Sequence, residues 1–182
     1  MRDSPSPLPP SSIAKSPIET VGDGSIVVRA MAELFGRKDG YCMGRSGSMH
    51  LADLSKGIMG ANGIVGGGIP TAVGIALALQ MHRSDQILLS YFGDGASNEG
   101  EFHESLNLAA LWQLPVLFVC ENNQFATEVP FQYSAGNTDV GSRGANYGMA
   151  GVTVDGNDVW AIYQAAQEAR LTGPVTNRWF QT

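Results

Sequence analysis

Two short apolar segments, each followed by a polar tip, are the feature that most constrains the fold of this chain. Residues 87–92 and 115–120 are both apolar and have the length of buried strands. Residues 98–112, between them, have the spacing and composition of a helix. A strand, a helix and a second strand form a right-handed βαβ unit, in which the two strands are parallel. The sequence therefore predicts an α/β fold, with a parallel sheet and helices on both of its faces.

The polar tips of these two strands indicate where a ligand binds. Gly93-Asp94-Gly95 closes the first strand, and Asn122-Asn123 closes the second. In a βαβ unit both tips emerge at the carboxyl edge of the sheet, where open α/β sheets bind their ligands. Neighbouring strands lie about 5 Å apart, so Asp94 and Asn123 can share one cation. The pair predicts a site for a cation and a phosphate.

The oxygen donors at these tips suit a diphosphate that is held through a divalent metal. Mg²⁺ takes six oxygens and uses one or two carboxylates together with phosphate oxygens and water. Asp94 offers a charged oxygen, Asn123 a neutral one, and the backbone carbonyl of Phe125 a third. Gly93 and Gly95 let the chain turn sharply and let a phosphate approach main-chain N–H groups.

The helix after the first tip is expected to begin near Asn98. Asn98 and Glu101 have the spacing of a capping box, which would fix the first turn. The positive end of that helix would then point at the phosphate. Glu99, Glu101 and Glu104 gather in the same turns, and compensation of the helix dipole explains them without any function.

Composition narrows the class of protein. A chain of 182 residues with 43% hydrophobic residues can bury one sizeable core. Its net charge of −6 argues against a nucleic-acid partner, and no apolar run approaches the roughly 20 residues of a membrane helix. The two cysteines suggest a reducing compartment. We expect a cytoplasmic protein, with the mitochondrial matrix and the plastid left open.

The remaining sequence predicts one domain with a flexible leader. Residues 1–25 are rich in Pro and Ser and are predicted to be flexible, and residues 26–182 form the α/β domain. Further helices are expected at 26–35, 69–81, 139–147 and 158–170, a strand at 152–154, and a polar loop from Asn123 to about Gly136. His50 lies in a glycine-rich loop, where a histidine taken in isolation is more simply a solvated residue.

A family resemblance rests on these motifs. The stretch from Gly93-Asp94-Gly95-Ala96-Ser97-Asn98 through Asn107-Leu108-Ala109 to Glu121-Asn122-Asn123 resembles the thiamine diphosphate motif. More narrowly, it is similar to the alpha subunit of the E1 component of 2-oxo acid dehydrogenase complexes, of the pyruvate or acetoin type. Residues 31–40, 47–50, 60–66 and 154–159 match as well. The resemblance covers roughly residues 28–171.

The resemblance assigns roles at the diphosphate end of the cofactor. It implies that Asp94, Asn123 and the carbonyl of Phe125 bind magnesium, and that Gly95 and Ala96 contact the diphosphate of thiamine diphosphate. The hard chemistry in such enzymes belongs to the cofactor, while the protein supplies orientation and electrostatics.

The resemblance also assigns residues near the reactive ring. Gly63 and Val65 are expected to lie against the aminopyrimidine, and His50 to line the active-site channel and help position the substrate. In this family the C2 carbanion of the cofactor attacks the carbonyl of a 2-oxo acid, carbon dioxide leaves, and the acyl group passes to a lipoyl arm. The residues leave pyruvate, acetoin and branched-chain substrates open.

Two partners follow from the resemblance. The cofactor lies between this alpha chain and a beta subunit, which carries the glutamate for the aminopyrimidine, so an α2β2 heterotetramer is expected. The second partner is the lipoyl-bearing E2 acyltransferase. The Gly/Ala-rich surface of the helix at 69–81 and the apolar residues 131–133 are candidates for the subunit interface.

The chain departs from the family at both flanks. Residues 1–27 hold no equivalent of the Tyr-Arg pair that grips the diphosphate, and the apolar strand and His-bearing loop expected after Gly173-Pro174 are replaced by residues 175–182. We interpret the chain as truncated at both ends. Two hypotheses therefore remain: an enzyme subunit that is active with its beta partner, or a non-catalytic remnant that keeps the cofactor-binding fold or the interface.

Overall fold

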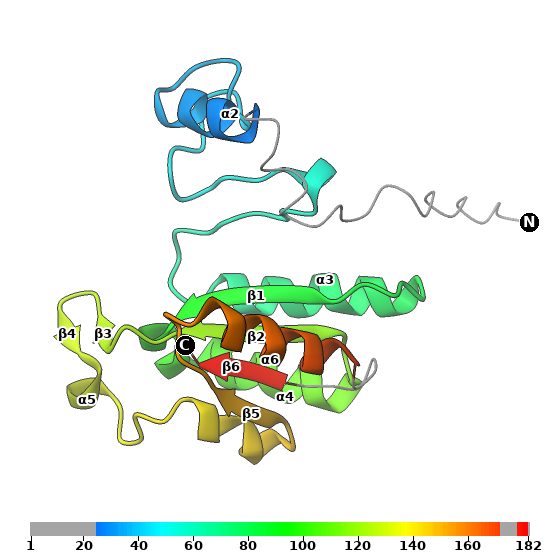
Figure 1. The fold of residues 1–182 in the computed structure, drawn as a ribbon, viewed down its shortest axis with the longest axis vertical. Coiled ribbons are helices and arrows are strands. Elements are labelled where there is room, and N and C mark those ends of the chain that lie inside the picture. Colours follow the sequence, from blue (N-terminus) through cyan, green and yellow to red (C-terminus); the bar gives the residue numbers. More distant parts are fainter. Residues whose placement is uncertain (1–24, 172–177, 182) are drawn as a thin grey trace, which may run out of the picture. The chain divides into compact units, whose positions relative to one another are not determined.

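The computed structural model describes residues 25–171 and 178–181 of a chain that divides into two compact units, residues 1–63 and 64–182 (Figure 1). The first unit contains helix α2 (Ser25–Leu34), the 3-10 helix η2 (Leu54–Lys56) and the loops around them. Helix α2 confirms the helix expected at 26–35. The flexibility predicted for residues 1–25 concerns a segment that, apart from Ser25, lies outside the described residues. The division after Gly63 falls inside the single domain proposed for residues 26–182.

A buried carboxylate organises the loop that follows α2. Glu33 is 1% exposed. Its Oε2 accepts hydrogen bonds from the N–H groups of Cys42 at 2.7 Å and Gly44 at 2.8 Å, and its Oε1 from the N–H and hydroxyl of Ser46 at 2.7 and 2.8 Å. Burial by itself raises the pKa of Glu33, but these bonds outweigh it and lower the pKa to about 2. The carboxylate therefore holds the loop as an internal anion.

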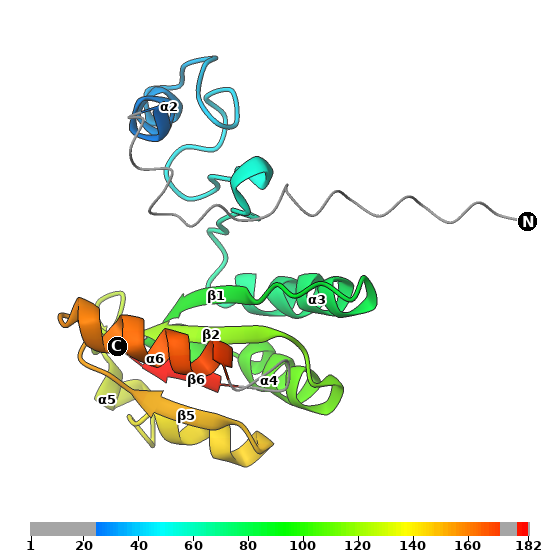
Figure 2. The ribbon, with the colours of Figure 1, turned by 45° about the vertical axis from the view of Figure 1, so that its right-hand side comes forward.

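The second unit is built on a parallel sheet. Its strands are β1 (Leu88–Gly93), β2 (Val116–Glu121), β5 (Ala150–Thr153) and β6 (Arg178–Gln181), in the order β1-β2-β6-β5, and all neighbours are parallel (Figure 2). Its helices are α3 (Gly68–Met81), α4 (Gly100–Trp112), α5 (Phe131–Ser134) and α6 (Val159–Leu171), with 3-10 helices η3 (Asp94–Asn98) and η4 (Gly141–Tyr147). A separate hairpin pairs β3 (Phe125–Ala126) with β4 (Val129–Pro130).

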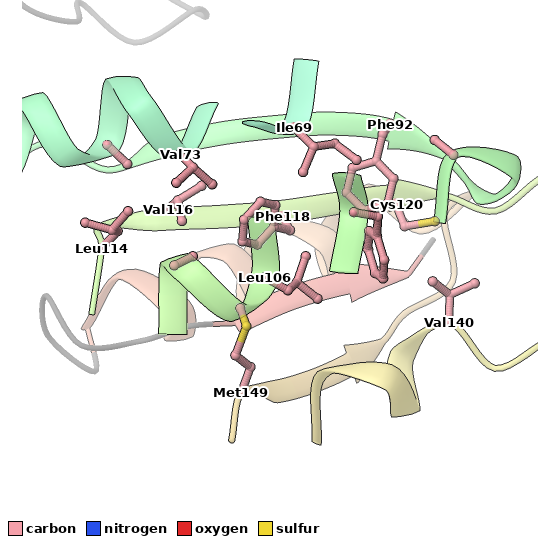
Figure 3. Close-up of a cluster of buried hydrophobic side chains, with 14 of the residues drawn as sticks. Ile69, Val73, Phe92, Leu106, Leu114, Val116, Phe118, Cys120, Val140 and Met149 are labelled. Carbon is pink, nitrogen blue, oxygen red and sulfur yellow. The ribbon is translucent and has the colours of Figure 1, made fainter. Parts of the chain in front are cut away.

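Strand β2 is buried on both faces, which places it at the centre of the unit. Its residues Val116, Phe118 and Cys120 pack into the core that α3 and α4 cover (Figure 3), whereas Leu117 and Val119 pack with residues of α6. The alternation follows the period of two along a strand. Helices therefore lie on both faces of the parallel sheet, as the sequence predicted. No helix within the described ranges is long and apolar enough to cross a membrane.

Two expectations about the chain after Asn123 were wrong. Residues 124–136 are not an open polar loop, because the β3–β4 hairpin and α5 form there and Phe131 is fully buried. The short helix expected near residues 139–147 is present as the 3-10 helix η4. Residues 178–181 form β6, between β2 and β5, where we expected no strand. Tertiary pairing decides these short elements, and local sequence periodicity does not report it.

Candidate metal and phosphate site

The structure brings the two polar tips to one edge of the sheet. Gly93, the last residue of β1, pairs with Glu121, the last residue of β2, so Asp94 and Asn123 follow neighbouring parallel strands at the same level. Burial raises the pKa of the Asp94 carboxylate, hydrogen bonding from the backbone of Gln124 helps to lower it, and the Gln124 N–H donates to Oδ1 of Asn122 at 3.1 Å. In Figure 1 the β3–β4 hairpin lies beyond the arrowheads of β1 and β2, at this edge. The loop that carries the Asn pair therefore touches Asp94.

Asp94 carries a carboxylate oxygen without a partner. The residue is 1% exposed, and its Oδ2 accepts no hydrogen bond from the described residues. Burial raises the pKa of Asp94 above its ordinary value of 3.8, while hydrogen bonds from backbone N–H groups, those of Gly95 and Gln124 among them, oppose the rise. A buried, orphaned carboxylate oxygen is costly on its own. A cation at Oδ2 would supply the missing partner.

Asn123 and Phe125 offer the neutral oxygens. Oδ1 of the exposed Asn123 accepts a hydrogen bond of 2.9 Å from the N–H of Phe125, which closes a turn of the Asx type. An amide oxygen has two lone pairs, so one remains for a metal. Phe125 pairs across the hairpin with Pro130, which has no N–H to donate to the Phe125 carbonyl.

The two glycines beside Asp94 differ in the space that the structure leaves for a side chain. A Cβ added to Gly95 would stand 2.8 Å from the Cβ of Ala126, so Gly95 is required by the approach of the hairpin. A Cβ on Gly93 would meet no atom within 4 Å, and its φ of −80° suits any residue. The structure therefore leaves open space next to the main chain at Gly93. We still predict, without a direct test, that a phosphate approaches the main chain there.

The capping box expected at the start of the following helix is not formed. Helix α4 begins at Gly100, and its N-cap residue, Glu99, makes no side-chain cap hydrogen bond. Asn98 instead ends the 3-10 helix η3, and its side chain donates to the Ser134 carbonyl at 3.1 Å and accepts from Arg143. A stronger set of tertiary partners replaces the local cap, so the turn of η3 separates Asp94 from α4.

The residues expected near the aminopyrimidine fall in both units. Val65 is exposed in the second unit, next to Gly66, whose Cβ would meet the side chain of Glu99 at 3.3 Å. The first unit holds His50, which is exposed, and Gly63, whose Cβ would stand 3.2 Å from Nε2 of His50. In the second unit it is therefore Gly66, the neighbour of Val65, that lies close to Glu99 before α4, and in the first unit Gly63 lies close to His50.

Sequence reasoning missed the side chains that support the turn after Asp94. The Ser97 hydroxyl, fully buried, donates a 2.6 Å hydrogen bond to the carbonyl of Asp94, and Arg143 donates to Ser97 in turn. Ser97 lies inside the motif and could have been singled out by its place. Arg143 stands 46 residues further along in a polar segment, where no pattern marks it.

Cys120 is a core residue, as predicted. It is fully buried in β2, where burial, together with the charge of Asp94, raises the pKa of its thiol to about 12 against the opposing effect of Arg143. Such a thiol stays protonated at neutral pH and is a poor nucleophile.

The donor set fits a magnesium ion that phosphate oxygens complete. In the part of the chain that the structure describes, no three Asp, Glu, His or Cys side chains converge on one point that could hold a metal. One carboxylate, one amide oxygen and one carbonyl leave half of an octahedral shell to the ligand and to water. This edge therefore suits a metal that arrives with a diphosphate.

Comparison with known protein families shows which family this chain belongs to. The family model described as the dehydrogenase E1 component matches residues 17–172. The chain belongs to the dehydrogenase E1 component family. The match contains every candidate site residue named above.

Two proteins with similar sequences are named as alpha subunits. The chain is 54% identical over 139 residues to subunit alpha of acetoin:2,6-dichlorophenolindophenol oxidoreductase from Bacillus subtilis, which covers 76% of this chain and 42% of the relative. It is 45% identical over 139 residues to the pyruvate dehydrogenase E1 component subunit alpha of Rhizobium meliloti, which covers 76% of this chain and 40% of the relative. The chain thus spans less than half the length of these curated relatives.

A solved structure agrees on the fold. The chain superposes with a TM-score of 0.54 on a putative thiamin diphosphate-dependent enzyme from Mycobacterium smegmatis, at 25% identity. The superposition covers 70% of this chain and 24% of that one. The parallel sheet with helices on both faces is therefore part of a thiamine diphosphate-binding fold.

Proposed function

We propose that this chain carries the diphosphate-binding half of a thiamine diphosphate site in an E1-type dehydrogenase, with Mg²⁺ held by Asp94, Asn123 and the carbonyl of Phe125. The observation that carries the proposal is the buried Oδ2 of Asp94, which lacks a partner among the described residues. Membership of the dehydrogenase E1 component family supports it.

At the diphosphate end of the cofactor, the proposed role of the protein is to bind and orient the metal and the diphosphate. Asp94 supplies the negative charge that keeps Mg²⁺ in place, and the two neutral oxygens set its position. Gly93, Gly95 and Ala96 form the main chain that the diphosphate approaches. When bound, thiamine diphosphate supplies the carbanion that cleaves the bond next to a carbonyl.

The resemblance to the family also assigns roles near the reactive ring. Val65 and Gly63 are assigned to the aminopyrimidine, and the exposed imidazole of His50 to substrate positioning as a hydrogen-bond donor or acceptor.

The proposed reaction is oxidative decarboxylation of a 2-oxo acid or cleavage of acetoin, with transfer of the acyl group to a lipoyl group. Subunits named for acetoin are 54% and 49% identical to this chain, and the one from Rhizobium meliloti named for pyruvate is 45% identical. Both substrates therefore belong in the assay. The proposed partners are a beta subunit, in an α2β2 heterotetramer, and a lipoyl-bearing E2 acyltransferase, in the cytoplasm or in an organelle matrix.

Titration with and without a beta subunit tests the proposal. We expect weak Mg²⁺-dependent binding of thiamine diphosphate to the chain alone, tighter binding to the pair, and turnover of acetoin or pyruvate by the pair. Binding without any turnover would support the second hypothesis, in which the chain is a non-catalytic remnant. No Mg²⁺-dependent binding by either the chain or the pair would overturn the proposal.

A further inference from the structure

We propose that Arg143 is the positioning residue of the metal-binding turn, holding Asp94–Asn98 in the conformation in which the Asp94 carboxylate meets a cation. This inference rests on the proposed function. Nothing in the family motif singles out Arg143, which follows Asp94 by almost fifty residues and belongs to the 3-10 helix η4.

The guanidinium of Arg143 clamps the last two residues of the turn. Its Nη1 donates to the carbonyl of Ser97 at 2.6 Å and to the Ser97 hydroxyl at 3.0 Å. Nη1 and Nη2 both donate to Oδ1 of Asn98 at 3.2 Å. Nη2 also donates to the carbonyl of Asn137 at 3.0 Å, which ties the turn to the segment before η4. One planar group thus joins three residues from two distant segments.

The clamp reaches Asp94 through one further hydrogen bond. The Ser97 hydroxyl that accepts from Arg143 donates to the backbone carbonyl of Asp94 at 2.6 Å. Because Ser97 is fully buried, water cannot easily replace either bond. Arg143 therefore acts on the conformation of the main chain at Asp94, without touching its carboxylate.

The guanidinium of Arg143 is surrounded by neutral groups. All its hydrogen-bond acceptors named above are neutral oxygens, and the half-buried guanidinium lies over the ring of Phe131, 5.9 Å from its centroid.

Lysine is not expected to replace Arg143. The ammonium of lysine is a point charge, whereas the five N–H groups of guanidinium form a rigid fork that can bridge several acceptors at once. The proposal therefore predicts that the shape of the group matters as well as its charge.

Amide hydrogen exchange on the full chain without cofactor tests the clamp directly. In Arg143→Ala we expect the amides of residues 96–98 to exchange about tenfold faster, since the hydrogen bonds that hold this turn are lost. Amides of β2 should keep their rates, and ethylguanidinium added to the variant should restore protection at 96–98. Arg170→Ala, which removes an exposed arginine at the end of α6, is the matched control and should change neither region.

Cofactor binding gives the second readout. In the full chain with its beta subunit, Arg143→Ala should weaken Mg²⁺-dependent binding of thiamine diphosphate about tenfold to a hundredfold. Ethylguanidinium should recover most of this loss, whereas Arg143→Lys should not.

Three results would overturn the inference. They are unchanged exchange at residues 96–98 in Arg143→Ala, an equal rise in exchange throughout β2, and wild-type behaviour of Arg143→Lys in both assays. If the wild-type pair binds no thiamine diphosphate, the proposed function fails, and the exchange rates of the cofactor-free chain still decide whether Arg143 holds the turn.

Discussion

Gly95 and Ala126 lie so close together that a Cβ on Gly95 would stand 2.8 Å from the Cβ of Ala126 and 3.1 Å from its Cα. The contact joins the turn after β1 to the hairpin after β2. The chain therefore fixes the approach of its two strand tips by packing, in addition to any ligand that the tips share.

The first prediction follows from this contact. Gly95→Ala should push the hairpin away from η3 and lower the free energy of unfolding by about 1–3 kcal/mol, as overpacking does. Denaturant unfolding measures the change. Gly93→Ala is the matched control, because its Cβ meets no atom within 4 Å, and it should unfold like the wild type. Equal stability of Gly95→Ala and Gly93→Ala would contradict the packing account.

The second prediction separates the stability of Asp94 from its function. Burial raises the pKa of Asp94, so the carboxylate is ionised at neutral pH at a cost, and that cost disappears as the pH falls through the raised pKa. Asp94→Asn should therefore stabilise the metal-free chain at neutral pH, and the gain should shrink in acid.

Denaturant unfolding of the metal-free protein across the acid range checks this prediction. Asp85→Asn, an exposed aspartate in the same unit, is the control and should change little. A loss of stability in Asp94→Asn at neutral pH would mean that the carboxylate is already satisfied by the protein.

The third prediction concerns residues 131–133, which the sequence suggested as a subunit interface. Phe131 is fully buried in the core, whereas Tyr133 is 78% exposed. Phe131→Ala should lower the free energy of unfolding by about 3–5 kcal/mol, in the range for a large core residue. Tyr133→Ala should leave it within about 0.5 kcal/mol. Thermal unfolding of the isolated chain distinguishes the two, and similar midpoints for both variants would contradict the burial of Phe131.

The fourth prediction concerns the buried carboxylate of the first unit. The pKa of Glu33 is lowered from 4.5 to about 2, so its stabilising contribution is complete above pH 4.5 and is lost as the pH falls towards 2. Glu33→Gln should destabilise the fold of residues 25–63 above pH 4.5, and the difference from wild type should shrink in acid. Amide exchange of Cys42, Gly44 and Ser46 reports it locally. A constant difference down to pH 2 would contradict the assignment.

Much of the fold follows from periodicity. Strands β1 and β2 and helices α2, α3, α4 and α6 are apolar or periodic over many residues, so burial and hydrogen bonding favour one conformation. Asp94 and Asn123 follow strands that end at the same edge of the sheet because β1 and β2 pair in parallel. These features are local, or depend on a single neighbouring strand.

The rest could not be predicted because it depends on distant partners. Asn98 has the sequence context of a helix cap, but Arg143 and the carbonyl of Ser134 compete for its side chain and win. Glu33 reads as an ordinary helical glutamate until three N–H groups from the following loop converge on it. Strand β6 depends on pairing with β2 and β5.

The central claim is that Asp94 and Asn123 hold one divalent cation together with a diphosphate. Electron paramagnetic resonance of Mn²⁺, a stand-in for Mg²⁺, measures it directly when thiamine diphosphate is titrated into the chain and its beta subunit. The account predicts a bound Mn²⁺ signal that requires thiamine diphosphate in the wild type, persists in Asp85→Asn, and is lost in Asp94→Ala and weakened in Asn123→Ala. An unchanged signal in Asp94→Ala would contradict it.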